Sequence, residues 1–365
     1  MILSGPRVML GCARGLLTLA AILIGPVMAR ADEPVSARVE SNLATALPRI
    51  RQHAFDGDPA TDFASEQNAR AGDQLTLRFE KPVDPSSITV ATDRLEAGSL
   101  EVSHDGREFK KVAAFSNGAA RLVSQQHGVL AFRVVSDRAM DHPLVIREIA
   151  IESQPRVALF ANPVEFVLDS KDAPEMLPWL KQAAEICERA YPMINHELAS
   201  PGFKPAKVIH MALKSRYDGV AATSGDRIIG AVGFFKRNPG DFGAMVHETT
   251  HVVQHYQGNE NPGWLVEGVS DYVRFFKYEP GHLGPIRKSR ARYDHGYRES
   301  AAFLAYLVKT YDSRIVLKLN AAMREGTYQD ALFETITKKP LKTLGEEWLG
   351  SLPGPDRKPE VKAPS

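Results

Sequence analysis

Cysteine is almost absent from this chain, which has only two among 365 residues. Cys12 precedes a short apolar run near the N-terminus and is expected to be removed together with it. Only Cys187 then remains, and a single cysteine cannot form an internal disulfide. The fold must therefore be held by its cores and by any bound metal.

Long hydrophobic runs are missing as well. The run from Leu16 to Val27 is shorter than the ~20 residues that span a bilayer, and no later run is long enough, so we predict no membrane span. Residues 1–31 combine arginines, this run and the small-x-small ending Ala29-Arg30-Ala31, which is the pattern of a cleavable export signal. The protein is therefore expected to be secreted or periplasmic.

The chain also lacks an excess of charge of either sign. It has 45 Lys and Arg against 44 Asp and Glu, a formal net charge of +1. Removal of residues 1–31, with three arginines and no acid, leaves 42 basic against 44 acidic residues and a net charge of −2. Such a balance indicates no nucleic-acid partner and no anionic membrane surface.

The most informative segment that is present is His247-Glu248-Thr249-Thr250-His251, an H-E-x-x-H pattern. On a helix, residues four positions apart lie on one face, so both imidazoles can reach a single Zn²⁺ ion. Glu248 directly follows the first histidine and can act as the general base toward water on the metal. A polar helix with ordinary histidines is the alternative interpretation.

A third metal ligand is predicted at Glu267, sixteen positions after His251. It lies in residues 264–274, which we predict as a second helix after an Asn-Pro-Gly turn. Three protein ligands leave a position open for water, which is the catalytic rather than the structural pattern. Asp271, four residues further, can accept the second ring N–H of a ligand histidine, or it can be a solvated charge.

A competing zinc geometry is excluded by two residues. The metzincin pattern requires glycine at 254 and histidine at 257, where this chain has Gln254 and Gln257. Three histidines at 247, 251 and 255 of one helix would span about 12 Å and cannot share an ion. We therefore expect His255 to be an outer partner of the site or a helix-end residue, with contact to the substrate as the alternative.

At these motifs the sequence resembles the plant and bacterial basic secretory protein peptidases, which are zincins with a glutamate as third ligand. The resemblance covers roughly residues 160–350 and is carried by 246–254, 262–274 and 293–304. It implies zinc held by His247, His251 and Glu267, with Glu248 as the base and a peptide or protein as substrate. In the third stretch, Tyr297 is our first candidate for a donor to the developing oxyanion, and His295 is the second.

The first part of the chain has a different pattern. Leu75, Leu77 and Phe79 alternate with polar residues, as do Leu130, Phe132 and Val134, then Ile149 and Ile151. Short alternating strands without intervening helices predict an antiparallel sandwich. Residues 54–63 and 100–109 resemble the discoidin or coagulation-factor C-type jelly rolls, which implies a module that binds carbohydrate or another cell-surface ligand.

A calcium site is a second cofactor prediction. Asp56, Asp58 and Thr61 supply clustered oxygens, and Glu148 precedes the last strand of the module, as in relatives with a structural Ca²⁺. An ordinary Asx turn is the alternative for these residues.

The strand nearest to the motif is predicted at 228–234, either as a core strand or as an edge strand that pairs with an extended peptide. Asp241 is predicted to cap the motif helix.

The whole pattern predicts a multidomain chain: a signal peptide (1–31), a discoidin-like antiparallel β-sandwich (32–154), an α+β zincin-like metallopeptidase domain (156–350) and a disordered tail (351–365). The predicted function is that of a secreted zinc endopeptidase. The alternatives are a surface-binding protein with a vestigial zinc site and a zinc aminopeptidase, although no acidic anchor for a substrate amine is evident.

Overall fold

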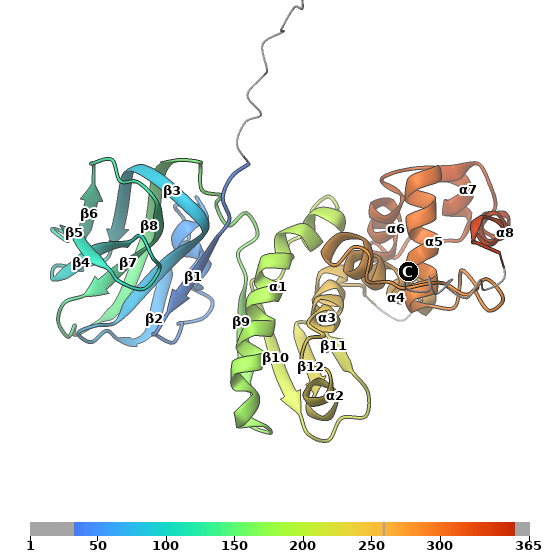
Figure 1. Ribbon diagram of the computed structural model, residues 1–365, viewed down its shortest axis with the longest axis horizontal. Coiled ribbons are helices and arrows are strands. Elements are labelled where there is room, and N and C mark those ends of the chain that lie inside the picture. The colour runs from blue at the N-terminus through green and yellow to red at the C-terminus, as the bar shows by residue number, and fades with distance from the viewer. Residues whose placement is uncertain (1–32, 258–259, 355–365) are drawn as a thin grey trace, which may run out of the picture. The chain divides into compact units, whose positions relative to one another are not determined.

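The computed structural model describes residues 33–257 and 260–354 (Figure 1). The predicted signal at 1–31 and positions 355–365 of the predicted tail lie outside the described residues, while Ser351 is still the last residue of a helix. Within the described ranges, no helix combines the length and the apolar character needed to cross a membrane.

The N-terminal part consists of antiparallel strands. They are β1 (Ala37–Ser41), β2 (Phe63–Asn68), β3 (Gln74–Thr92), β4 (Gly98–Ser103), β5 (Lys110–Ala114), β6 (Ala119–Leu122), β7 (Val129–Ser136) and β8 (Pro143–Gln154). Their order is β2-β8-β3-β7-β4-β5, and β1 and β6 both pair with β3. The prediction of an antiparallel β-fold for this part of the chain is confirmed.

Strand β3 links the two layers of this fold because it takes part in both. The first half of its 19 residues pairs with β1 and β7, and the second half pairs with β8 and β6. The register shifts between Arg78 and Val83, around Pro82, which has no N–H for the ladder. A strand that bends from one layer into the other lets the two sheets face each other across one core.

The predicted alternation of these strands is confirmed at most positions. Leu75, Leu77 and Phe79 are buried, as are Phe132, Val134 and Ile149, whereas Leu130 and Ile151 are only partly buried. Most buried apolar side chains from Val35 to Val157 form one cluster, and most of those from Val164 to Trp348 form another. Each half of the chain thus has a hydrophobic core of its own.

The second half is built from a small sheet and many helices. Its strands are β9 (Glu165–Asp169), β10 (Val208–Lys214), β11 (Ala221–Ser224) and β12 (Arg227–Ala231), in the order β11-β12-β10-β9. Strands β9, β10 and β12 run parallel, and β11 is antiparallel to β12. The helices are α1 (Leu177–Glu197), α2 (Val232–Arg237), α3 (Gly243–Gln254), α4 (Gly263–Tyr272), α5 (Tyr297–Thr310), α6 (Ile315–Arg324), α7 (Ala331–Thr337) and α8 (Leu341–Ser351). This mixed architecture confirms the predicted α+β class.

The strand predicted at 228–234 is partly wrong. Strand β12 ends at Ala231, and the rest of the apolar run begins α2. Phe235 of α2 folds back onto the strand, so closely that a Cβ at Gly230 would lie 2.8 Å from its ring. Short apolar runs do not distinguish strand from helix. Moreover β12 lies between β10 and β11, so the outer strand on this side of the sheet is β11, which we did not predict.

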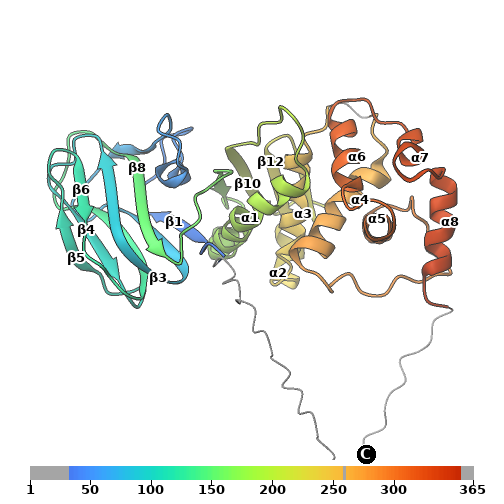
Figure 2. The same ribbon diagram turned by 90° about the horizontal axis from the view of Figure 1, so that it is seen from above.

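Helices α3 and α4 occupy the middle of this half. Helix α3 packs against both β11 and α4, and α4 packs against α5. In both views α4 lies between α3 and the group formed by α5 to α8 (Figures 1 and 2). The H-E-x-x-H helix therefore has a strand on one side and the Glu267 helix on the other.

Candidate active site

Helix α3 presents both motif histidines on one face. It begins two residues after the predicted cap, yet the Asp241 carboxylate still accepts the N–H of Ala244 at 3.2 Å. The helix ends at Gln254, where His255 takes a left-handed conformation with φ of 47°. His255 is thus a helix-end residue, one of the two positions expected for it.

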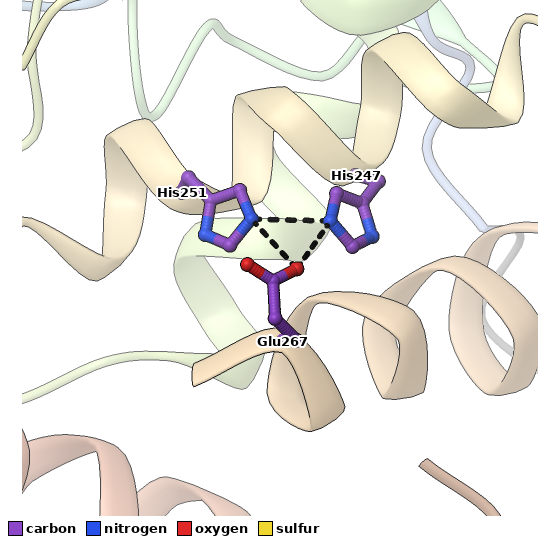
Figure 3. A group of neighbouring side chains, drawn as sticks. All are labelled: His247, His251 and Glu267. Carbon is purple, nitrogen blue, oxygen red and sulfur yellow. Dashed lines mark hydrogen bonds and ion pairs between the residues drawn. The ribbon is translucent and has the colours of Figure 1, made fainter. Parts of the chain in front are cut away.

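Three side chains converge between α3 and α4 (Figure 3). The Nε2 atoms of His247 and His251 are 3.1 Å apart, and Glu267 Oε2 lies 3.2 Å from the first and 3.5 Å from the second. Among the described residues, only these three form a group of His, Cys, Asp or Glu side chains close enough to hold a metal ion together. The structure thus brings together the three ligands predicted from the sequence.

The hydrogen bonds of the two Nδ1 atoms fix the tautomers of His247 and His251. Asp271 Oδ1 lies 2.7 Å from His247 Nδ1, and Gln254 Oε1 lies 2.7 Å from His251 Nδ1. The Gln254 amide is oriented because its Nε2 donates to Val266 O at 2.9 Å. Both acceptors require a proton on Nδ1, so each neutral imidazole directs a lone pair from Nε2 toward the centre.

This donor set fits zinc. In a tetrahedral site with bonds of about 2.0–2.1 Å, neighbouring ligand atoms are about 3.3 Å apart, close to the separations seen here. Two imidazole lone pairs and a carboxylate oxygen at these distances repel one another unless a cation lies between them. Nitrogen and oxygen ligands of this kind suit zinc, and three of them leave a position free.

The electrostatics of the site also favour a bound cation. Burial disfavours the charged form of His247, but the hydrogen bonds that its ring donates to the carboxylates of Asp271 and Glu267 outweigh burial and raise the pKa of the imidazole to about 9. Burial likewise disfavours the charged form of Glu267, but the two histidines lower its pKa to about 2. The two shifts have a common cause, because the carboxylates favour a positive charge between α3 and α4, and a zinc ion would supply that charge.

Asp271 gives a testable consequence of this geometry. Because its carboxylate orients His247, Asp271→Asn is expected to weaken zinc binding about 10 to 100-fold while the protein stays folded. Zinc affinity measured by competition with a chromophoric chelator, together with circular dichroism, checks this. If the affinity is unchanged, Asp271 is only a buried charge beside the site.

Glu248 has a partner that sequence reasoning missed. Its side chain is buried at 7% exposure, and the Thr223 hydroxyl lies 2.7 Å from Oε2 and 3.0 Å from the backbone oxygen of Glu248. Nothing in the sequence pointed to Thr223, because it lies 25 positions earlier on β11. Gln254 was also missed as a partner of His251, although its position three residues later on the same helix could have revealed it.

The two oxyanion candidates differ in position. Tyr297 begins α5 with φ of 49°, directly after Gly296 at φ of 84°, and its ring stacks on His247 with centroids 6.2 Å apart. The charge of Glu267 raises the pKa of Tyr297, so the phenol keeps its proton at neutral pH. His295 is exposed, lies 3.8 Å from Glu299 and does not line the site cavity. The structure thus places Tyr297, but not His295, beside the predicted metal ligands.

His247, Glu248, His251, Glu267 and Tyr297 line an open cavity of about 1120 Å³. Other residues that line it come from β11, the start of α5 and the π-helical turn Val273–Tyr278 after α4. A cavity of this size is sufficient for several residues of an extended peptide.

Three of the four predicted calcium residues form a local turn, and the fourth, Glu148, lies on β8. Asp56 Oδ1 accepts from the Asp58 N–H at 3.0 Å and from the Thr61 hydroxyl at 3.0 Å, and Asp58 Oδ1 accepts from the Ala60 N–H at 2.9 Å. Burial and the charges of Asp56 and Asp58 raise the pKa of Glu148. Both aspartates accept hydrogen bonds within the turn, as expected for the alternative of an ordinary Asx turn. The calcium site stays a prediction.

The N-terminal strands are similar to those of several carbohydrate-binding modules of known structure. Solved structures similar to the N-terminal strands include CBM32-1 of a family 31 glycoside hydrolase from Clostridium perfringens (16% identity, 32% of this chain and 92% of that one, TM-score 0.28). A second is a pectin-binding carbohydrate-binding module, at 17% identity over 33% of this chain and 93% of that one, with a TM-score of 0.27. A third is chitosan-binding module 1 of a chitosanase/glucanase from Paenibacillus sp. IK-5, at 13% identity over 32% of this chain and 93% of that one, with a TM-score of 0.27. No curated protein matches the chain.

The second half of the chain gives a match of another kind. Residues 165–348, just over half of the 365, match a protein family described as peptidases of plants and bacteria, abbreviated BSP. This range contains β9, α3, α4 and every residue of the site between them. The chain therefore belongs to the BSP family of plant and bacterial peptidases.

Proposed function

We propose that this protein is an exported zinc-dependent endopeptidase. The observation that carries the proposal is the convergence of three lone-pair atoms, from His247, His251 and Glu267, beside the buried carboxylate of Glu248. Membership of a peptidase family supports a peptide or protein substrate. Export rests on the signal pattern at residues 1–31.

The chemistry follows from the roles of the side chains. Bound zinc would lower the pKa of its water toward 7 and polarise the scissile carbonyl. Glu248 accepts the proton of the attacking water and later gives it to the leaving amine. Asp271 and Gln254 keep the two histidines in the tautomer that directs Nε2 inward, so the ligands need no rearrangement before reaction.

The developing oxyanion needs a hydrogen-bond donor, and Tyr297 is the residue we assign to this role. Its ring stacks on a ligand histidine, and its phenol stays protonated. Tyr297→Phe should therefore lower kcat by about 10²-fold or more with zinc content unchanged. Steady-state kinetics with metal analysis test this, and Tyr306→Phe on the same helix is the control. Unchanged turnover would remove Tyr297 from the mechanism.

The proposed function is tested with purified protein. We expect one zinc ion per chain, cleavage of a denatured protein at internal bonds, loss of cleavage with a chelator and recovery on addition of zinc. Mass spectrometry of the products separates an endopeptidase from an aminopeptidase. Zinc-loaded protein that cleaves no denatured substrate would favour the alternative of a binding protein with a vestigial site.

For the N-terminal part we propose a carbohydrate- or surface-binding module at residues 32–154, followed by the peptidase domain at 156–350. The proposal rests on the resemblance of residues 54–63 and 100–109 to discoidin-type modules and on the separate hydrophobic core of this part. Binding of the full chain to a panel of insoluble polysaccharides tests it. Retention on none of them would leave the module without support as a carbohydrate binder.

A further inference from the structure

The outer strand β11 contacts the catalytic motif directly, through Thr223. This residue pairs with Ile228 in the ladder to β12, and its hydroxyl reaches Glu248 on α3. The hydroxyl has a single proton to donate. The carboxylate oxygen Oε2, at 2.7 Å, is closer than the backbone oxygen of Glu248, at 3.0 Å, and it is the charged acceptor. The stronger bond therefore goes to the carboxylate.

The carboxylate of Glu248 depends on this bond for its orientation. It is buried, and within the described residues no other side chain donates a hydrogen bond to it. The last torsion of a glutamate side chain is broad, so an unbonded carboxylate can rotate. A catalytic group must be held within about 0.5 Å and 10–20° of its working geometry. One hydrogen bond to Oε2 removes this freedom and leaves Oε1 without a protein donor.

We propose that Thr223 is a positioning residue for the general base. Its hydroxyl holds Oε2 of Glu248, so that Oε1 is the oxygen that receives the proton of the attacking water. The inference rests on the proposed peptidase function and deepens it, because it assigns different roles to the two carboxylate oxygens. It also gives the outer strand a part in the reaction besides lining the cavity.

The test compares two substitutions at one position. Thr223→Val keeps the shape of the side chain and removes the hydroxyl, whereas Thr223→Ser keeps the hydroxyl. Thr335→Val, on the exposed side of α7, is the matched control, because it removes a threonine hydroxyl that bonds only its own helix. Zinc content, kcat and KM are measured for each variant. The affinity for a small hydroxamate, which chelates zinc and shares a proton with the neighbouring carboxylate, is measured by calorimetry.

We expect Thr223→Val to retain one zinc ion per chain and an unchanged KM, while kcat falls about 10 to 100-fold, as for other hydrogen bonds to charged groups. Its hydroxamate dissociation constant should rise about tenfold or more for the same reason. Thr223→Ser should restore most of both quantities, and Thr335→Val should change neither.

Two outcomes overturn the inference. One is a Thr223→Val enzyme with the kcat and hydroxamate affinity of the parent. The other is an equal loss in Thr223→Val and Thr223→Ser, which would show that the shape of the side chain matters and the hydroxyl does not. If the zinc-loaded parent binds hydroxamate but hydrolyses no peptide, the peptidase proposal fails, while the hydroxamate affinities still report on Thr223.

Discussion

Glu248→Gln is expected to retain one zinc ion per chain and to lose almost all hydrolysis, a fall in kcat of about 10² to 10⁴-fold. Glutamine has nearly the same shape, and its amide oxygen can still accept the Thr223 hydroxyl, so the change removes the base without disturbing the strand or the metal ligands. Metal analysis and single-turnover cleavage of a fluorogenic peptide measure the two quantities.

Glu346→Gln is the control for this substitution, because Glu346 is exposed on α8 and lies far along the chain from the motif. It should match the parent in both zinc content and rate. A Glu248→Gln protein that still cleaves at the parental rate would show that another group accepts the proton, and the role of the H-E-x-x-H glutamate would have to be abandoned.

Glu267→Ala is expected to lose the metal itself. Without Oε2 the remaining ligands are two imidazoles on one helix, and the negative charge that attracts a cation is reduced by one. Zinc affinity should fall by more than about 100-fold, the upper range for losing an outer partner such as Asp271, and hydrolysis should disappear with the metal. Competition with a chromophoric chelator gives the affinity.

Glu346→Ala is the matched control and should bind zinc like the parent. Circular dichroism of metal-free Glu267→Ala separates loss of a ligand from loss of the fold. If Glu267→Ala binds zinc as tightly as the parent, the third ligand is misassigned, whatever happens to its activity.

The histidine pair and Glu267 differ in how far the local sequence alone could predict their positions. The H-E-x-x-H spacing needs only a helix to bring its two histidines together, and the structure supplies that helix at Gly243–Gln254. Glu267 comes from a separate helix after a turn. Its motif context, rather than its spacing alone, indicated that it would face the histidines, and the packing of α4 on α3 makes the contact.

The errors of the sequence interpretation have a common cause. The apolar run at 228–234 is predicted as one strand, but a buried strand followed directly by a helix with a buried start, Val232, gives the same apolar pattern. The four-residue strand β11 carries little apolar signal, because its residues are at most partly buried. Strand prediction from sequence depends on alternating buried apolar residues. A strand at the edge of a sheet beside a cavity buries few residues, so it lacks this alternation.

By itself, the sequence determined the two fold classes, the motif helix and the identity of the predicted metal ligands. The fold classes and the pairing of His247 with His251 follow from short-range periodicity, since residues two apart on a strand or four apart on a helix share a face whatever surrounds them, whereas Glu267 was indicated by its motif context. The tertiary structure alone decided that Thr223 contacts Glu248 and that Tyr297 rather than His295 lies over His247. Those contacts join separate elements through the packing of β11 and α5 around α3 and α4, and no local spacing encodes which side chains meet there.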